Sequence, residues 1–242
     1  MIALTVVDDA EAAARLCAER VVAAIDHARA ARGSAHISLA GGTTAARTYE
    51  LLAELTTDWR DVHLWFGDER CVPLDDPDSN HLLLTRTLLD RLPAKRAQPM
   101  VHAVTRAGDG DPPAAAASYE RALRASVDAA GARDGLPVLD LALLGLGEDG
   151  HTASLFPDDP VLEERERLVV AVRGSKPPPD RVTFTLPLLR AARAIVVLTA
   201  GGGKAQAVQA TLAGASPHTP ASLLGEGAAV ELIADRAAAA AT

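Results

Sequence analysis

The stretch LPVLDLALLGLGEDGHTASLFP, residues 136–157, joins an apolar run to a loop rich in glycine and charge. Its first part, VLDLALLG (138–145), has the length of a β-strand and is nearly all apolar, as a strand covered on both faces should be. Runs of the same kind recur along the chain and alternate with longer amphipathic segments. This alternation is typical of repeated β-α units, and it predicts an α/β fold with a mostly parallel sheet.

The rest of the chain extends this pattern. Strands are expected at residues 4–7, 36–40, 62–67, 138–145, 168–172, 181–186, 194–200 and 230–234. Helices are expected at residues 9–31, 44–56, 79–91, 112–130 and 203–213, most of them opened by an Asp, Thr or Ser at the cap. We expect a single domain over residues 1–242, a three-layer, open, Rossmann-like sheet with helices on both faces. The C-terminal RAAAAAT is expected to be a frayed tail.

Composition excludes several classes of protein. The formal net charge is -8 and only 3% of residues are aromatic, which argues against a nucleic-acid partner. Cys17 and Cys71 cannot form a disulfide framework, and no zinc-finger spacing is present. The N-terminus lacks the pattern of a signal peptide, and no apolar run approaches the ~20 residues of a membrane span. We therefore expect a cytoplasmic protein, a monomer or homodimer, that binds a small molecule and no membrane.

Two glycine-rich loops are candidates for phosphate binding. The loop after the run HISLA (36–40) contains Gly41, Gly42, Thr43 and Thr44. Its backbone N–H groups and the start of the next helix can cradle a phosphate, although a tight turn with a threonine cap explains the same residues. Lys204 follows three glycines at the start of another helix, where a plain surface lysine is the alternative. Neither loop has the P-loop pattern, so nucleotide triphosphate hydrolysis is not expected.

Charged residues also end a buried strand. Asp68, Glu69 and Arg70 directly follow the run VHLWFG (62–67), and burying them is costly unless they are solvated, paired or bound to a ligand. A solvated turn with an internal ion pair is the alternative. Asn80 lies at an expected helix cap and could also reach the site. Arg181 opens the run RVTFTL (181–186) and is a further candidate for a phosphate.

The loop at 145–150 matches the pattern G-x-G-x-x-G, but we reject a dinucleotide site. Asp149 and its acidic neighbour lie where a pyrophosphate would bind, and Pro157 interrupts the helix that should support it. Such acids suit a sugar hydroxyl or a histidine better than a phosphate. His151 is therefore a candidate general acid or base, since imidazole titrates near neutral pH. Ser154 has no nucleophile elbow around it and is assigned to packing or capping.

Taken together, the loops resemble the 6-phosphogluconolactonase family. The matching segments are GGTT (41–44), DERCVP (68–73), SN (79–80), GLGEDGHTASLFP (145–157), RVT (181–183) and GGGK (201–204). The resemblance covers nearly the whole chain, and its DER-x-VP and DGHTASLFP segments are the specific ones. Ala40 departs from the pattern, because many members have a serine there.

The resemblance implies a metabolic enzyme that needs no metal and no organic cofactor. The reaction is hydrolysis of 6-phospho-D-glucono-1,5-lactone to 6-phospho-D-gluconate in the oxidative pentose phosphate pathway. We assign the base role to His151, while Asp149 or Asp68 orients the imidazole or holds sugar hydroxyls, and the sequence does not separate these two. The phosphate is assigned to Arg70, Arg181 and Lys204 with the backbone of Gly41, Gly42, Thr43 and Thr44.

Two other functions compete with the lactonase. Glucosamine-6-phosphate deaminases share the Asp-Gly-His element, but they read Asp-Glu-Tyr at the second loop and have a glutamate before the proline of the third. This chain has Arg70 and Phe156 at those places. The carboxylate that would orient the histidine of a deaminase is therefore missing, and the extra arginine favours a more anionic ligand. A catalytically silent sugar-phosphate-binding protein is the second alternative; it would bind substrate analogues without turnover.

Overall fold

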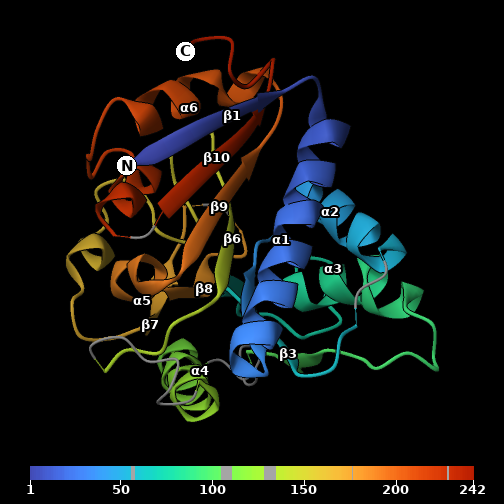
Figure 1. Ribbon diagram of the computed structural model, residues 1–242. Coiled ribbons are helices and arrows are strands. Elements are labelled where there is room, and N and C mark those ends of the chain that lie inside the picture. Colours follow the sequence, from blue (N-terminus) through green and yellow to red (C-terminus); the bar gives the residue numbers. More distant parts are fainter. Residues whose placement is uncertain (56–57, 105–110, 128–134, 176, 228) are drawn as a thin grey trace.

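The computed structural model describes residues 1–55, 58–104, 111–127, 135–175, 177–227 and 229–242. Seven strands form the main sheet in the order β1-β10-β9-β6-β2-β3-β5, and every neighbouring pair is parallel (Figure 1). The strands are β1 (Ile2–Val7), β2 (Ala35–Leu39), β3 (Val62–Phe66), β5 (Met100–His102), β6 (Leu141–Gly145), β9 (Ala194–Thr199) and β10 (Ala229–Asp235). The predicted α/β fold with a mostly parallel sheet is confirmed.

Helices cover both faces of this sheet. The α-helices are α1 (Ala10–Arg32), α2 (Thr43–Glu54), α3 (Asn80–Thr87), α4 (Pro112–Ser126), α5 (Leu186–Ala191) and α6 (Ala205–Leu212). Short 3₁₀ helices are η1 (Leu89–Arg91), η3 (Pro160–Glu163), η4 (Gly202–Lys204) and η5 (Pro220–Glu226). The first three α-helices bury one apolar cluster against the sheet and the last three bury another, as expected from side chains that alternate along each strand.

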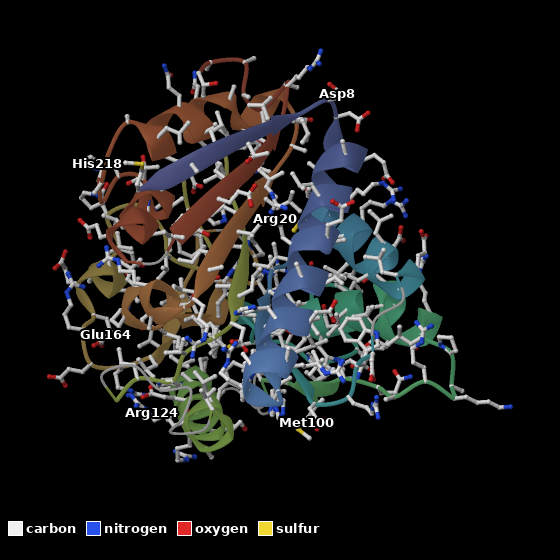
Figure 2. The ribbon with its side chains drawn as sticks, in the orientation of Figure 1. Asp8, Arg20, Met100, Arg124, Glu164 and His218 are labelled. Carbon is white, nitrogen blue, oxygen red and sulfur yellow. The ribbon has the colours of Figure 1, made fainter. Side chains whose placement is uncertain are left out.

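Polar contacts join the helices to the sheet as well. Arg20 reaches from α1 to Glu231 on β10, with 2.7 Å between Nε and Oε2 (Figure 2). No helix of the described residues is long and apolar enough to cross a membrane.

A second, antiparallel sheet has the order β4-β8-β7, with β4 at Asp68–Arg70, β7 at Val169–Arg173 and β8 at Asp180–Phe184. The predicted strands at 168–172 and 181–186 are both present here, outside the parallel sheet. The reason is the short connection at 174–179, because parallel neighbours need a crossover of roughly a dozen residues or more.

Several element boundaries differ from the sequence-based expectations. The predicted helix at 79–91 is split into α3 and η1, and the ends of two others, at residue 56 and at 128–130, lie outside the described residues. Strands β4 and β5 and helix α5 were not predicted, because three-residue strands and a two-turn helix give little periodic signal. The prediction of a frayed C-terminal tail is wrong for Ala238 and Ala239, which are buried against the core.

The direction of the chain reverses at the centre of the main sheet. From β2 the chain proceeds to β3 and β5 on one side, while from β6 it proceeds to β9 and β10 on the other. Since β2 and β6 are neighbours, the loops that follow them meet at a topological switch point. Ligands of open parallel sheets bind at such points, at the carboxyl ends of the strands.

At the β5 edge, three histidines stack with a tryptophan on one face of the sheet. Ring centroids are 4.3 Å apart for His36 and His63, 5.2 Å for His63 and His102, and 3.7 Å for His102 and Trp65. The indole N–H of Trp65 donates to Nδ1 of His36 over 3.2 Å. Burial, reinforced by the neighbouring imidazoles, lowers the pKa of His36 and of His102 to about 4, and burial also lowers the pKa of His63.

This histidine cluster predicts that the fold loses stability in mild acid. The histidine pKa values are lower in the folded than in the unfolded chain, so stability is full above about pH 6.5 and falls as the pH drops toward 4. Each histidine contributes at most about 1.4 kcal/mol per pH unit to this slope. Urea unfolding of wild type and His102→Phe between pH 7 and pH 4 measures it, with the exposed His27→Gln as the control. An equally steep loss in His102→Phe would contradict the assignment.

Candidate active site

A cleft of about 190 Å³ lies at the switch point and brings the predicted loops together. Among the predicted site residues it is lined by Gly41, Gly42, Asp68, Arg70, His151, Arg181 and Lys204. A second hollow of about 240 Å³ adjoins it, shares Gly41, Gly42 and Lys204 with it, and adds Thr43 and Thr44. The four segments that sequence patterns selected separately therefore converge on one place.

His151 is held by a tight turn after β6. The N–H of Gly147 donates to the carbonyl of His151 over 2.8 Å, and Nδ1 of His151 lies 2.5 Å from Oδ1 of Asp149. Burial alone would raise the pKa of Asp149, but the contact with His151 outweighs it and the pKa of this carboxyl is lowered. A carboxylate partner favours the proton on Nδ1, which leaves Nε2 as the basic nitrogen. The sequence left Asp149 and Asp68 as equal candidates to orient the imidazole, and it is Asp149 that contacts it.

Asp68 is engaged differently. Its carboxylate accepts a hydrogen bond of 2.7 Å from the hydroxyl of Ser154, and both side chains are buried. The Ser154 hydroxyl is thus committed to a carboxylate, which agrees with its assignment to packing rather than to nucleophilic attack. Asp68 lines the cleft and is in place for a polar group of a ligand.

Asn80 and Glu69 fix the backbone next to the cleft. The amide of Asn80 donates to the carbonyl of Asp68 over 2.8 Å, and its side chain fills the space where a Cβ on Gly41 would stand. Glu69 is 1% exposed, and it accepts the N–H groups of Asn80 and His81 over 2.8 and 2.9 Å. Burial raises the pKa of Glu69. Glu69 therefore anchors the start of α3, a role that the sequence did not reveal.

Two arginines stand side by side at the cleft. Arg70 on β4 and Arg181 on β8 are direct cross-strand partners, and like charges in that arrangement repel. Burial, together with the charge of Arg70, lowers the pKa of Arg181. The guanidinium carbon of Arg181 lies 5.8 Å from the ring centroid of Phe156, whose ring is 5.1 Å from that of His151. Two adjacent cations at a cleft wall suit an anionic ligand.

A helix start and a lysine add further positive potential. Gly42, not a threonine, occupies the N-cap of α2, where no side chain among the described residues caps the helix. The first N–H groups of α2 are thus available to an anion. The ammonium of Lys204 has neither a hydrogen bond nor an ion pair within the described part of the chain, and it lines both hollows. The described residues contain no group of three His, Cys, Asp or Glu side chains placed to hold a metal.

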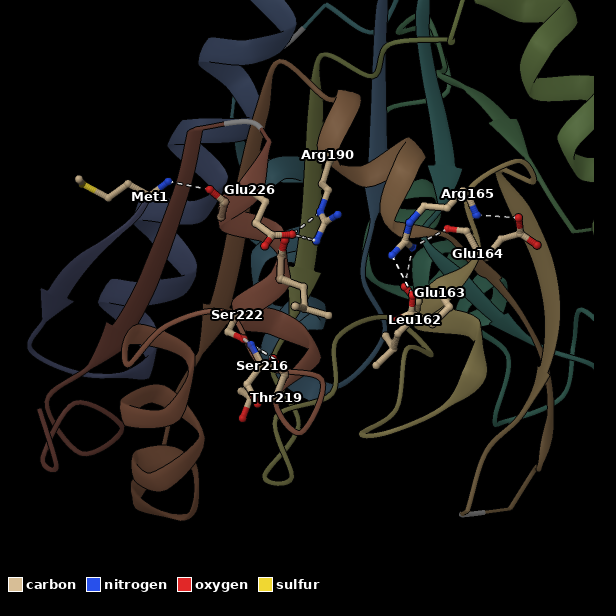
Figure 3. A network of polar contacts seen from close by, with 12 residues as sticks. Met1, Leu162, Glu163, Glu164, Arg165, Arg190, Ser216, Thr219, Ser222 and Glu226 are labelled. Atoms are coloured by element: carbon tan, nitrogen blue, oxygen red, sulfur yellow. Dashed lines mark hydrogen bonds and ion pairs between the residues drawn. The ribbon is translucent and has the colours of Figure 1, made fainter.

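The turn that carries His151 is also braced by the segment 216–222. The hydroxyl of Ser222 donates to the carbonyl of Thr219 over 2.6 Å and accepts the N–H of Ser216 over 2.9 Å (Figure 3). The N–H of Ala221 then donates to the carbonyl of Gly150 over 3.1 Å. This arrangement fixes the backbone immediately before His151.

Gly150→Ala is therefore expected to lower activity more than stability. Gly150 has φ +84°, and an added Cβ would lie 2.8 Å from Cγ2 of Thr219, so the His151 turn and Thr219 must shift relative to each other. Gly33→Ala is the matched control, since Gly33 has φ +83° with open space around it, at the end of α1. Turnover and melting temperature of both variants separate backbone strain from displacement of His151. Equal activity in the two variants would contradict the prediction.

Comparison with known proteins gives the family to which the chain belongs. Residues 8–233 match the family described as glucosamine-6-phosphate isomerases/6-phosphogluconolactonase. The chain is 43% identical over 204 residues to a 6-phosphogluconolactonase of Mycobacterium tuberculosis, covering 82% of this chain and 81% of the relative. It is 42% identical over 221 residues to one of Streptomyces coelicolor, covering 88% and 83%. A solved 6-phosphogluconolactonase of Trypanosoma brucei has a TM-score of 0.84 at 28% identity, covering 99% of this chain and 98% of that one. The chain belongs to the family of glucosamine-6-phosphate isomerases and 6-phosphogluconolactonases.

Proposed function

We propose that this protein hydrolyses 6-phospho-D-glucono-1,5-lactone to 6-phospho-D-gluconate in the pentose phosphate pathway. The observation that carries the proposal is the pairing of His151 with Asp149 in a cleft that also holds two arginines and a lysine. The relatives from Mycobacterium tuberculosis and Streptomyces coelicolor carry the name of this activity and support it.

The chemical step needs one group that first removes and then returns a proton. His151 accepts a proton from water as the water oxygen bonds to the C1 carbonyl carbon. When the tetrahedral intermediate collapses, the bond from C1 to the ring oxygen breaks and the same proton passes to that oxygen. Asp149, ionised and in contact with Nδ1, stabilises the imidazolium between the two transfers. Asp68, held by Ser154, is assigned to a sugar hydroxyl.

The phosphate is assigned to the basic side of the cleft. Arg70, Arg181 and Lys204 offer charge-assisted hydrogen bonds, and the uncapped start of α2 adds its N–H groups. A local basic cluster is needed because the net charge of -8 would otherwise repel a dianionic substrate.

The direct test is turnover of the lactone against its spontaneous hydrolysis. The substrate is generated in situ from glucose 6-phosphate with its dehydrogenase, and 6-phosphogluconate is followed through a second, coupled dehydrogenase. A rate above the no-enzyme control is expected. A rate equal to that control would overturn the proposal, and turnover of glucosamine 6-phosphate would then identify the deaminase. Binding of 6-phosphogluconate with turnover of neither substrate would identify the silent sugar-phosphate-binding protein.

The remaining assignments stay predictions from the sequence. They are a single domain over residues 1–242, a monomer or homodimer in the cytoplasm, and a reaction without metal or organic cofactor. The proposed partner is a phosphorylated sugar lactone.

A further inference from the structure

A buried carboxylate lies under the loop that carries Lys204. Asp235, the last residue of β10, is 7% exposed. Its two oxygens accept the N–H of Gly201 over 3.0 and 3.1 Å, and one of them also accepts the N–H of Ala238 over 2.7 Å. The neighbouring Arg236 pairs with Asp8 instead, and no cation of the described chain forms an ion pair with Asp235.

The hydrogen bond from Gly201 to Asp235 fixes the backbone of the turn that leads into η4 and Lys204. Gly201 has φ +92° and is the N-cap of η4, whose last residue is Lys204. The N–H of Lys204 donates back to the carbonyl of Gly201 over 3.0 Å. On the other side of the turn, a Cβ on Gly203 would stand 2.9 Å from Oε1 of Glu148, in the loop that precedes His151. The turn is thus hydrogen-bonded to the Asp235 carboxylate and lies close to Glu148 of the loop that precedes His151.

A carboxylate at this position needs an explanation. Burying this carboxylate without a cation costs free energy. Its negative charge also lies close to a cleft whose assigned ligand is an anion, and the two charges repel. Its oxygens are instead directed at backbone N–H groups, which a carboxylate binds more strongly than a neutral acceptor does. The Asp235 carboxylate thus orders the loop that carries Lys204 without forming an ion pair with the lysine.

We propose that Asp235 is a positioning residue: through Gly201 it holds Lys204 where the ammonium meets the substrate phosphate. The inference rests on the proposed function, because it takes the phosphate as the partner of Lys204. It also gives the C-terminal turn a part in substrate affinity, since Ala238 binds the same carboxylate.

The test is a double-mutant cycle on affinity for 6-phosphogluconate, measured by calorimetry. Asp235→Ala is expected to raise Kd roughly five- to thirtyfold, and Asp235→Asn, which keeps one acceptor oxygen, by less. In a Lys204→Ala background the Asp235→Ala substitution is expected to leave Kd unchanged, because the group through which it acts is gone. A purely structural role would weaken binding equally in both backgrounds.

The control is Asp111→Ala, which removes the cap of α4 at the N–H of Ala114 and is expected to lower the melting temperature without changing Kd. An unchanged Kd in Asp235→Ala, or equal losses with and without Lys204, overturns the inference. Absence of lactone turnover in a wild type that binds 6-phosphogluconate overturns the proposed activity alone, and the binding cycle still decides the role of Asp235.

Discussion

His151→Ala is expected to lower kcat by roughly 10²- to 10⁴-fold while 6-phosphogluconate still binds. The reason is that His151 is assigned the roles of proton acceptor and proton donor, whereas the phosphate is assigned to Arg70, Arg181 and Lys204 of the same cleft. Asp149→Asn is expected to lower kcat as well, because an amide at 2.5 Å from Nδ1 no longer stabilises the imidazolium. The coupled lactonase assay gives kcat, and calorimetry gives the affinity for the product.

His218→Ala is the matched control for this experiment. His218 also pairs with a carboxylate, since its Nδ1 lies 2.7 Å from Oδ1 of Asp158, but its side chain is 78% exposed at the outer surface (Figure 2). Its removal is expected to leave kcat unchanged. Retention of wild-type kcat in His151→Ala would remove His151 from the base role. Loss of product binding in that variant would show that His151 holds the ligand rather than the proton.

Much of the main sheet and of the site was predictable from the sequence. The strands that contain His36, Val62 and Leu141 are largely apolar and have a glycine at or just after their ends, so local patterns predict their positions and their loops. Strands of a parallel sheet end at the same edge, and loops chosen for their chemistry are therefore brought together by the fold itself. This explains why His151 and Lys204, distant in sequence, line one cleft.

Features that depend on pairing between short segments were not predictable. Strand β4 consists of Asp68, Glu69 and Arg70, and three charged residues give no strand signal even though two of them are buried. Its register with β8, which places Arg70 beside Arg181, follows from the folded structure alone. The contact of Asp235 with Gly201 was not predictable either, because Gly201 lies in the loop after a different strand, β9. The sequence also did not show that Asp149, rather than Asp68, contacts His151, because this contact depends on the backbone conformation of the turn after β6.

The arginine pair predicts the second large effect. Arg181→Met, which keeps the apolar stem, is expected to lower kcat/KM by roughly 10- to 150-fold, equivalent to the about 1.5–3 kcal/mol of a charge-assisted hydrogen bond. Arg70→Met is expected to act in the same direction, because the two guanidinium groups face one ligand from adjacent strands. Arg181→Lys is expected to recover only part of the loss, since an ammonium cannot bind a phosphate in the bidentate manner.

Ligand-induced stabilisation tests this prediction without relying on turnover. In the free protein the charges of Arg70 and Arg181 repel, and burial also opposes the charge on Arg181. A bound phosphate relieves both costs, so 6-phosphogluconate is expected to raise the melting temperature of the wild type more than that of either methionine variant. Arg173→Met is the control, because Arg173 lies in the same small sheet but pairs with Asp180, 3.5 Å away, at an exposed position. Equal stabilisation of Arg181→Met and Arg173→Met by the ligand would place the phosphate elsewhere, on Lys204 and the start of α2.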